Sequence, residues 1–269
     1  KKWAFDTDDW VDSSPTVSNG VVYFAVANGK FYALDADTGE TQWVNDHGGG
    51  YASPTVVDGT VYTQRGGSVY AFDAGTGNQH WSYSIGSNAM SSGVQTDAYF
   101  SADPSPAVKS GLVFAGLDTL SDRGVYALSK YTGEKIWKCS QKIYSSPTVV
   151  DGTIYAGIQD GVCAIKTFNG NKKWTFDING RVTSSPTVAG SSICVGGPDE
   201  ETYVIDSEGS KKQEYGCSSP IESSPTVFRD YALHRTNGGA LLGWNVSDYA
   251  GTQSDGTRVK QRVLGHHDG

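Results

Sequence analysis

Histidine and cysteine are the side chains in which catalytic or metal-binding chemistry would first be sought in this chain. No Ser/His/Asp or metal-ligand spacing unites the histidines, which are His47, His80, His234, His266 and His267. The cysteines show neither CxxC nor adjacent-cysteine spacing, so we interpret them as buried thiols and leave their disulfide status open; they are Cys139, Cys163, Cys194 and Cys217. We therefore expect no catalytic residue and no metal ligand.

One aspartate-rich segment, Asp35-Ala36-Asp37-Thr38-Gly39, looks superficially like a calcium-binding loop. Its counterparts elsewhere read Asp73-Ala74-Gly75 and Ser129-Lys130-Tyr131, so the acidic ligands do not recur. Asp, Thr and Gly are also the residues that tight turns favour. We interpret this segment as a turn.

The elements that would position any site belong to a repeat marked by Ser-Pro-Thr-Val or a close variant. The anchor prolines are Pro15, Pro54, Pro106, Pro147, Pro186 and Pro225. Their separations of 39, 52, 41, 39 and 39 residues match one four-stranded unit, with an insertion after the second anchor. We expect an inner strand at each of the anchors.

Three further strands are expected in each unit. Asp58-Gly59 and Asp151-Gly152 predict two-residue hairpins because Gly accepts a positive φ. An alternating segment such as Phe31–Asp35 predicts the third strand. A Gly followed four residues later by Trp closes the unit, which places the tryptophans of the outer strands at Trp43, Trp81, Trp137 and Trp174.

The pattern SSPTVxxGxVYxGxxDGxxYALDxxTGxxxW is similar to the repeat of PQQ-type propellers, a family that includes quinoprotein dehydrogenases and BamB-like propellers. The resemblance extends to about Val246. It implies an all-β fold, a β-propeller of six four-stranded blades that forms a single domain over residues 1–269. In this family the outer-strand Trp docks between neighbouring blades, which the resemblance implies for Trp3, Trp43, Trp81, Trp137 and Trp174.

The fifth and sixth units depart from the pattern. Gln213 occupies the register of the docking Trp, with Tyr215 on the same strand face, so this contact is expected to be weakened or re-formed. Gly243-Trp244-Asn245 aligns with Ala33-Leu34-Asp35, which makes Trp244 a third-strand residue.

The outer strand missing from the sixth unit is expected at the other end of the chain. Lys1–Asp6 matches 172–177, the outer strand of the fourth unit. Pairing of this segment with the C-terminal blade would close the ring and leave no exposed sheet edge. Two alternatives stay open: the outer strand is supplied by Thr257–Leu264, or the chain is part of a seven- or eight-bladed propeller.

The residues three positions before each anchor proline are candidates for ligand binding. In propellers these loops share one face, around the mouth of the central channel, so pseudo-symmetry should gather Asp12, Tyr51, Asp103, Tyr144, Thr183 and Glu222. Carboxylates and aromatic faces suit a cation, a basic peptide segment or a sugar. Trp10, Lys142 and Arg181 would widen the patch.

Composition limits the partners. The net charge of −8 disfavours nucleic acid, and no apolar run is long enough for a membrane-spanning helix. The start at Lys1 indicates a processed protein or a domain of a longer one. We expect an extracellular, cell-surface or periplasmic location.

These observations favour a non-enzymatic binding scaffold or sensor propeller that recognises a protein or a carbohydrate and uses no cofactor. The alternative is a quinone-dependent dehydrogenase that would use PQQ with calcium. Family members with that activity are longer and eight-bladed, and they often carry a vicinal disulfide, which this sequence lacks.

Overall fold

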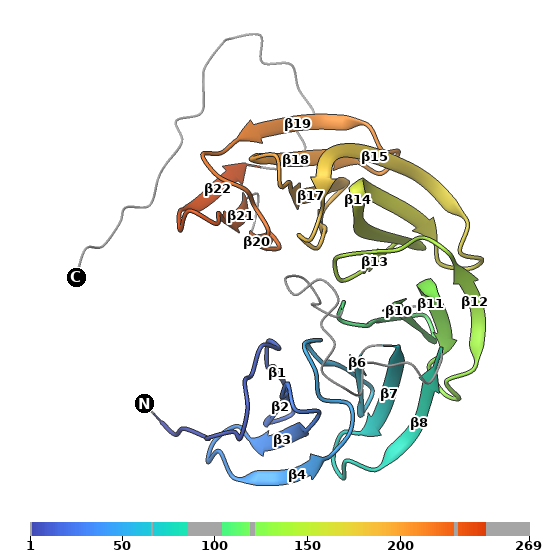
Figure 1. The fold of residues 1–269 in the computed structure, drawn as a ribbon, viewed down its shortest axis with the longest axis vertical. Helices are drawn as coiled ribbons and strands as arrows, with labels where there is room; N and C mark the ends of the chain where they lie inside the picture. Colours follow the sequence, from blue (N-terminus) through green and yellow to red (C-terminus); the bar gives the residue numbers. More distant parts are fainter. Residues whose placement is uncertain (1, 66, 86–103, 119–121, 229–230, 246–269) are drawn as a thin grey trace. The chain divides into compact units, whose positions relative to one another are not determined.

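The structure, a computed structural model, describes residues 2–65, 67–85, 104–118, 122–228 and 231–245 (Figure 1). Within these ranges the regular elements are all β-strands, which confirms the all-β fold. The chain divides into two compact units, residues 1–149 and 150–269, and each is described by itself. A single domain over residues 1–269 stays a prediction.

The first unit contains three four-stranded antiparallel sheets, each formed by one repeat with its strands in sequence order. Strand β1 contacts β5, and β5 contacts β9, so the three sheets stand side by side in chain order (Figure 1). The strands are β1 (Thr16–Ser18), β2 (Val21–Ala25), β3 (Phe31–Asp35), β4 (Thr41–Asn45), β5 (Thr55–Val57), β6 (Thr60–Arg65), β7 (Ser68–Asp73), β8 (Gln79–Ser84), β9 (Ala107–Lys109), β10 (Leu112–Asp118), β11 (Arg123–Ser129) and β12 (Lys135–Cys139).

The boundary between the units falls within β13 (Thr148–Val150). In the second unit, one long strand covers the second and third strand positions of the fourth repeat, the fifth repeat forms a four-stranded sheet, and the described part of the sixth forms three strands. The strands are β14 (Thr153–Lys166), β15 (Lys172–Arg181), β16 (Thr187–Ala189), β17 (Ser192–Gly196), β18 (Glu201–Asp206), β19 (Lys211–Gly216), β20 (Thr226–Phe228), β21 (Tyr231–Arg235) and β22 (Leu241–Asn245).

The anchors and hairpins form as the sequence predicts. Each inner strand starts directly after its anchor proline. Asp58 and Gly59 have φ values of 49° and 73°, and Asp151 and Gly152 have 47° and 71°. Two successive positive φ angles are the signature of the tight hairpin turn that Asp-Gly favours.

Both faces of the first sheet bury alternating side chains. Tyr23, Phe31 and Ala33 pack with Trp43 and with Val61 of the next repeat. The opposite face of the same sheet carries a second cluster, made of Phe24, Val26, Tyr32 and Leu34, with Trp3 and Phe5 packed against it. A sheet of this kind hides both faces only when it has a neighbour on each side.

Hydrogen bonds between successive anchors explain why Ser, Pro and Thr recur together. Within each unit, the amide of one anchor Ser donates to the hydroxyl of the next: Ser14 to Ser53, Ser53 to Ser105 and Ser105 to Ser146, each at 2.9 Å, and Ser185 to Ser224 at 3.0 Å. Thr hydroxyls donate to carbonyls of the next anchor, as Thr16 does to Pro54 at 2.6 Å and Thr187 to Pro225 at 2.7 Å. We call this set of bonds the serine ladder.

The closing strand stays a prediction. Residues 2–15 contain no strand, and the sixth sheet has three strands in the described part of the chain. The alternative segment, Thr257–Leu264, lies outside the described residues.

Candidate functional site

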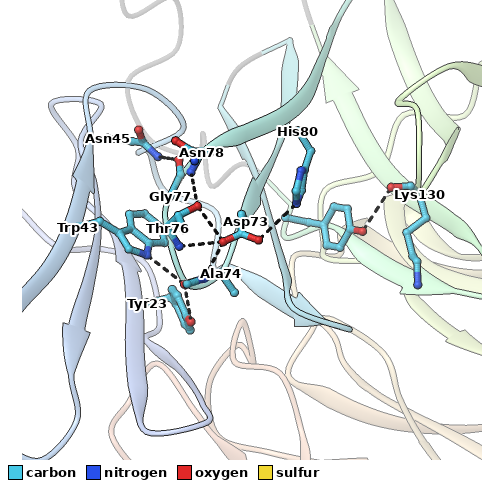
Figure 2. A network of polar contacts seen from close by, with 12 residues as sticks. Tyr23, Trp43, Asn45, Asp73, Ala74, Thr76, Gly77, Asn78, His80 and Lys130 are labelled. Atoms are coloured by element: carbon cyan, nitrogen blue, oxygen red, sulfur yellow. Dashed lines mark hydrogen bonds and ion pairs between the residues drawn. The ribbon is translucent and has the colours of Figure 1, made fainter.

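The junction between the first two repeats shows what the shared residues do. The indole N–H of Trp43 and the hydroxyl of Tyr23 both donate to the carbonyl of Ala74, each at 3.0 Å (Figure 2). Asn45 Nδ2 donates to the carbonyl of Gly77 at 2.7 Å. A Cβ at Gly77 would lie 2.7 Å from the Trp43 ring, so only glycine lets the ring come this close.

The same contact recurs with other tryptophans. Trp3 donates to Ala36 and lies over Gly39, Trp81 donates to Lys130 and lies over Gly133, and Trp174 donates to Ser207 and lies over Gly209. The N–O distances are 3.0, 3.0 and 2.8 Å. Trp137 is 9% exposed and pairs with Ala127, as Trp43 pairs with Ala33. The repeat pattern therefore serves packing between blades.

The fifth repeat replaces this contact as its sequence indicates. Gln213 pairs with Val204 in the register that Trp holds elsewhere, and its side chain is exposed. Tyr215 stacks on Trp244 of the third strand of the sixth repeat, with centroids 4.5 Å apart and ring planes 12° apart. The junction is thus re-formed by a different aromatic pair.

The aspartate-rich segment is a turn. Asp35 Oδ1 accepts hydrogen bonds from the amides of Asp37 and Thr38 and from the Thr38 hydroxyl. Asp73 Oδ1 does the same for Gly75 and Thr76 (Figure 2). The amide of Thr38 holds the pKa of Asp35 below its usual value, while the hydroxyl and amide of Thr76 do so for the pKa of Asp73.

The candidate residues before the anchors lie at loop ends. In the first unit, Asp12 is exposed, Tyr51 is 40% exposed and Tyr144 is half-buried. In the second, Thr183 is half-buried and Glu222 is exposed. Asp103 lies outside the described residues. We call this set the loop-end residues; their gathering around one mouth stays a prediction.

Within each unit the serine ladder connects segments that carry loop-end residues. Asp12 and Tyr51 each lie two residues before the Ser14–Ser53 bond, and Thr183 and Glu222 stand in the same relation to Ser185–Ser224. Of the flanking residues, Trp10 is 76% exposed and Arg181 is exposed. The Lys142 ammonium lies 4.9 Å from the ring centroid of Tyr144.

The family is decided by the extent of the repeat. The profile described as outer membrane protein assembly factor BamB matches residues 1–118 and 121–251. The chain belongs to this BamB family. A comparison with curated proteins gave no match.

Solved structures share the propeller fold of the BamB family at low identity. BamB from Moraxella catarrhalis is 18% identical with a TM-score of 0.61, over 90% of this chain and 87% of that one. Quinohemoprotein alcohol dehydrogenase from Comamonas testosteroni is 16% identical with a TM-score of 0.63, over 79% and 44%. The enzyme ADHIIG from Pseudomonas putida HK5 is 18% identical with a TM-score of 0.65, over 79% and 42%. The chain thus covers less than half the length of either dehydrogenase.

Sequence reasoning did not identify two further residues of this BamB-family chain. Arg65 lies over the backbone of Gly29 at the loop end of the first unit, and makes no ion pair with any described residue. His234 is 1% exposed on β21, and burial lowers its pKa to about 4. The run Gly48-Gly49-Gly50 was the one signal of the close packing around Arg65.

Neither a metal cluster nor a membrane-spanning helix is found in the described part of the chain. Among these residues, no group of three or more His, Cys, Asp or Glu side chains is placed to hold a metal ion. No helix long and apolar enough to cross a membrane occurs in the described ranges.

Proposed function

We propose that the chain is a non-enzymatic binding scaffold or sensor propeller that recognises a protein or a carbohydrate through its loop-end residues. One observation carries the proposal: side chains shared by the repeats are used in packing, whereas Asp12, Tyr51 and Glu222 differ between repeats and are exposed. Loops on a rigid scaffold are where recognition residues usually lie. Fold alone does not specify function, so the loop ends must carry it.

We propose an extracellular, cell-surface or periplasmic location, which the description of the matched family supports. The net charge of −8 makes nucleic acid an unfavourable partner. Further domains in a longer parent protein would fit a sensor or adaptor.

The test of this function compares two multiple variants for capture of partners from extracytoplasmic material of the source organism. The first changes the loop ends: Asp12→Asn, Tyr51→Ala and Glu222→Gln. The control changes Tyr131→Ala, Ile136→Ala and Phe168→Ala, which are exposed but lie away from the loop ends. We expect the wild type and the control to retain a common partner and the first variant to lose it. Retention by both variants would contradict the proposal.

We also propose that six blades close through the N-terminal segment. Trp3 makes the same contacts with the first repeat that Trp174 makes with the fifth. The ring centroids of Phe5 and Tyr32 are 5.4 Å apart, and those of Phe176 and Tyr203 are 5.5 Å apart. These shared contacts support the proposal that residues 2–5 act as the outer strand that precedes the first blade. The alternatives are a larger ring or an outer strand from Thr257–Leu264.

The second candidate function is a quinone-dependent dehydrogenase, favoured by the fold likeness to the quinohemoprotein alcohol dehydrogenases. The described residues provide no acidic cluster for the calcium ion that PQQ would need, so they do not fit this cofactor. Reconstitution with PQQ and calcium tests the candidate by a quinone absorbance band and dye-linked alcohol oxidation. Either signal would favour the enzyme over the scaffold.

A further inference from the structure

We propose that Trp10, Asp12, Tyr51 and Arg65 form a binding site for a neutral carbohydrate on the first unit. This inference rests on the proposed function and names the ligand class for one part of the loop ends.

The exposed Trp10 ring stands on a fixed backbone. The Trp10 carbonyl accepts a hydrogen bond from the amide of Ala27 at 2.9 Å, and its amide donates to Asp9 Oδ1 at 2.8 Å. Asp8, two residues earlier, is held by Lys30 at 2.5 Å and by Asn28 at 2.8 Å. Trp10 is nevertheless 76% exposed, above every other large apolar side chain in the described ranges. An exposed ring with an ordered main chain loses little entropy when a ligand covers it.

Arg65 is positioned by close packing against glycines. A Cβ at Gly29 would lie 2.0 Å from Arg65 Nη1, so the guanidinium rests directly on this turn. A Cβ at Gly50 would lie 3.3 Å from Arg65 Cγ. The segment that contains Gly50 is itself hydrogen-bonded to the turn at Gly29, because the Gly49 amide donates to the Gly29 carbonyl at 2.8 Å. The guanidinium keeps its hydrogen-bond donors without an ion pair among the described residues.

These contacts join the four residues into one surface. Trp10 is bonded to Ala27, which lies two residues before the Gly29 that contacts Arg65, and Tyr51 directly follows Gly50, which packs against the Arg65 stem. Asp12 lies between Trp10 and the Ser14–Ser53 bond. The surface therefore combines two exposed aromatic rings with one carboxylate and one guanidinium.

This combination suits a neutral sugar. A pyranose presents a C–H face that stacks on an aromatic ring, and the ring hides a large apolar area when it is covered. Sugar hydroxyls both donate and accept, so they can satisfy Asp12 and Arg65 together. A strongly basic peptide would be repelled by Arg65, and an anionic polymer would be repelled by Asp12 and by the net charge of −8. Both are therefore less favourable ligands than a neutral sugar.

The test measures binding of a panel of neutral glycans, namely oligosaccharides of β-glucan, α-glucan, mannan, galactan and chitin, by calorimetry and tryptophan fluorescence. We expect at least one to bind the full chain. Trp10→Ala and Arg65→Met should each weaken that binding at least tenfold, Trp10→Phe should restore part of it, and Tyr131→Ala should leave it unchanged.

Two results would overturn the carbohydrate site: no binding to any glycan of the panel, or equal affinity in wild type and Trp10→Ala. Binding of hexalysine that is lost on Trp10→Ala, without any glycan binding, would assign the surface to a basic peptide instead. In either case, loss of partner capture by the loop-end variant would show that the scaffold function itself still holds.

Discussion

At the scale of single residues, the docking tryptophan Trp43 joins the first blade to the second, and the same contact recurs at Trp3, Trp81 and Trp174. Trp43 is 8% exposed, stacks near Phe31 and bonds to Ala74 (Figure 2). Its truncation should leave a cavity between two sheets, whereas Gln213 is exposed and occupies a register from which the indole is missing. The side chain of Trp43 should therefore contribute much more to the free energy of unfolding than that of Gln213 does.

We expect Trp43→Ala to lower the free energy of unfolding by about 3–5 kcal/mol, the range found for buried aromatic truncations. Gln213→Ala should change it by less than about 0.5 kcal/mol, as exposed substitutions do. Urea denaturation of the two variants checks this. Equal losses would show that Gln213 is not in the docking register.

His234 should make stability depend on pH. Its folded pKa of about 4 lies below the usual 6.5, because burial disfavours the charged ring. The unfolded chain therefore binds the proton more readily, so stability is complete above pH 6.5 and falls as the pH drops toward 4. The full shift corresponds to about 3 kcal/mol as an upper bound.

Replacement by the residue found at the equivalent position of the first repeat, His234→Phe after Phe24, should remove most of this pH dependence. Urea denaturation at pH values of about 7.5 and about 5, on either side of the usual histidine pKa, measures it. His80→Phe, at an exposed histidine, is the control. A slope between the two pH values that is the same in wild type and His234→Phe would contradict the assignment.

At the scale of elements, the local sequence predicted the strands well but did not predict the hydrogen bonds and contacts that connect one repeat to the next. The prolines and Asp-Gly turns predicted the inner strands and hairpins because the cause is local: a fixed φ at Pro and a positive φ at Gly. The serine ladder was not predicted, since each bond links residues 39 to 52 apart in sequence. Arg65 was missed for the same reason, because Gly29 and Gly50 become its neighbours only after folding.

If the serine ladder stabilises the fold, removal of one anchor hydroxyl should lower the stability. Ser53→Ala removes the acceptor of the Ser14 amide, and an unsatisfied amide costs about 1–3 kcal/mol when it is buried. Because this site is partly exposed, we expect a loss near 1 kcal/mol, or about 2–4 °C in Tm for a chain of this size. Ser140→Ala, at an exposed serine, is the matched control in calorimetry. Equal Tm values for the two variants would mean that the ladder contributes nothing.

At the scale of the whole molecule, the proposed function requires six repeats that close into a ring and gather the loop ends. Two hydrogen-bonding groups of the serine ladder are available for this closure. The hydroxyl of Ser14 and the amide of Ser224 have no hydrogen-bond partner among the described residues, whereas the amide of Ser14 and the hydroxyl of Ser224 are both bonded within the ladder. In a six-bladed ring these two groups would face each other.

A cysteine cross-link tests closure most directly. In the double variant Ser14→Cys, Ser224→Cys, we expect a disulfide to form within one chain under mild oxidation, because ladder neighbours should lie within the Cα separation that a disulfide needs, about 4.4–6.8 Å. The pair Ser14→Cys, Ser53→Cys is the positive control, and Ser14→Cys, Ser185→Cys is the negative one. Peptide mapping that finds the disulfide of the positive control but no disulfide in the Ser14→Cys, Ser224→Cys variant would contradict a closed six-bladed ring.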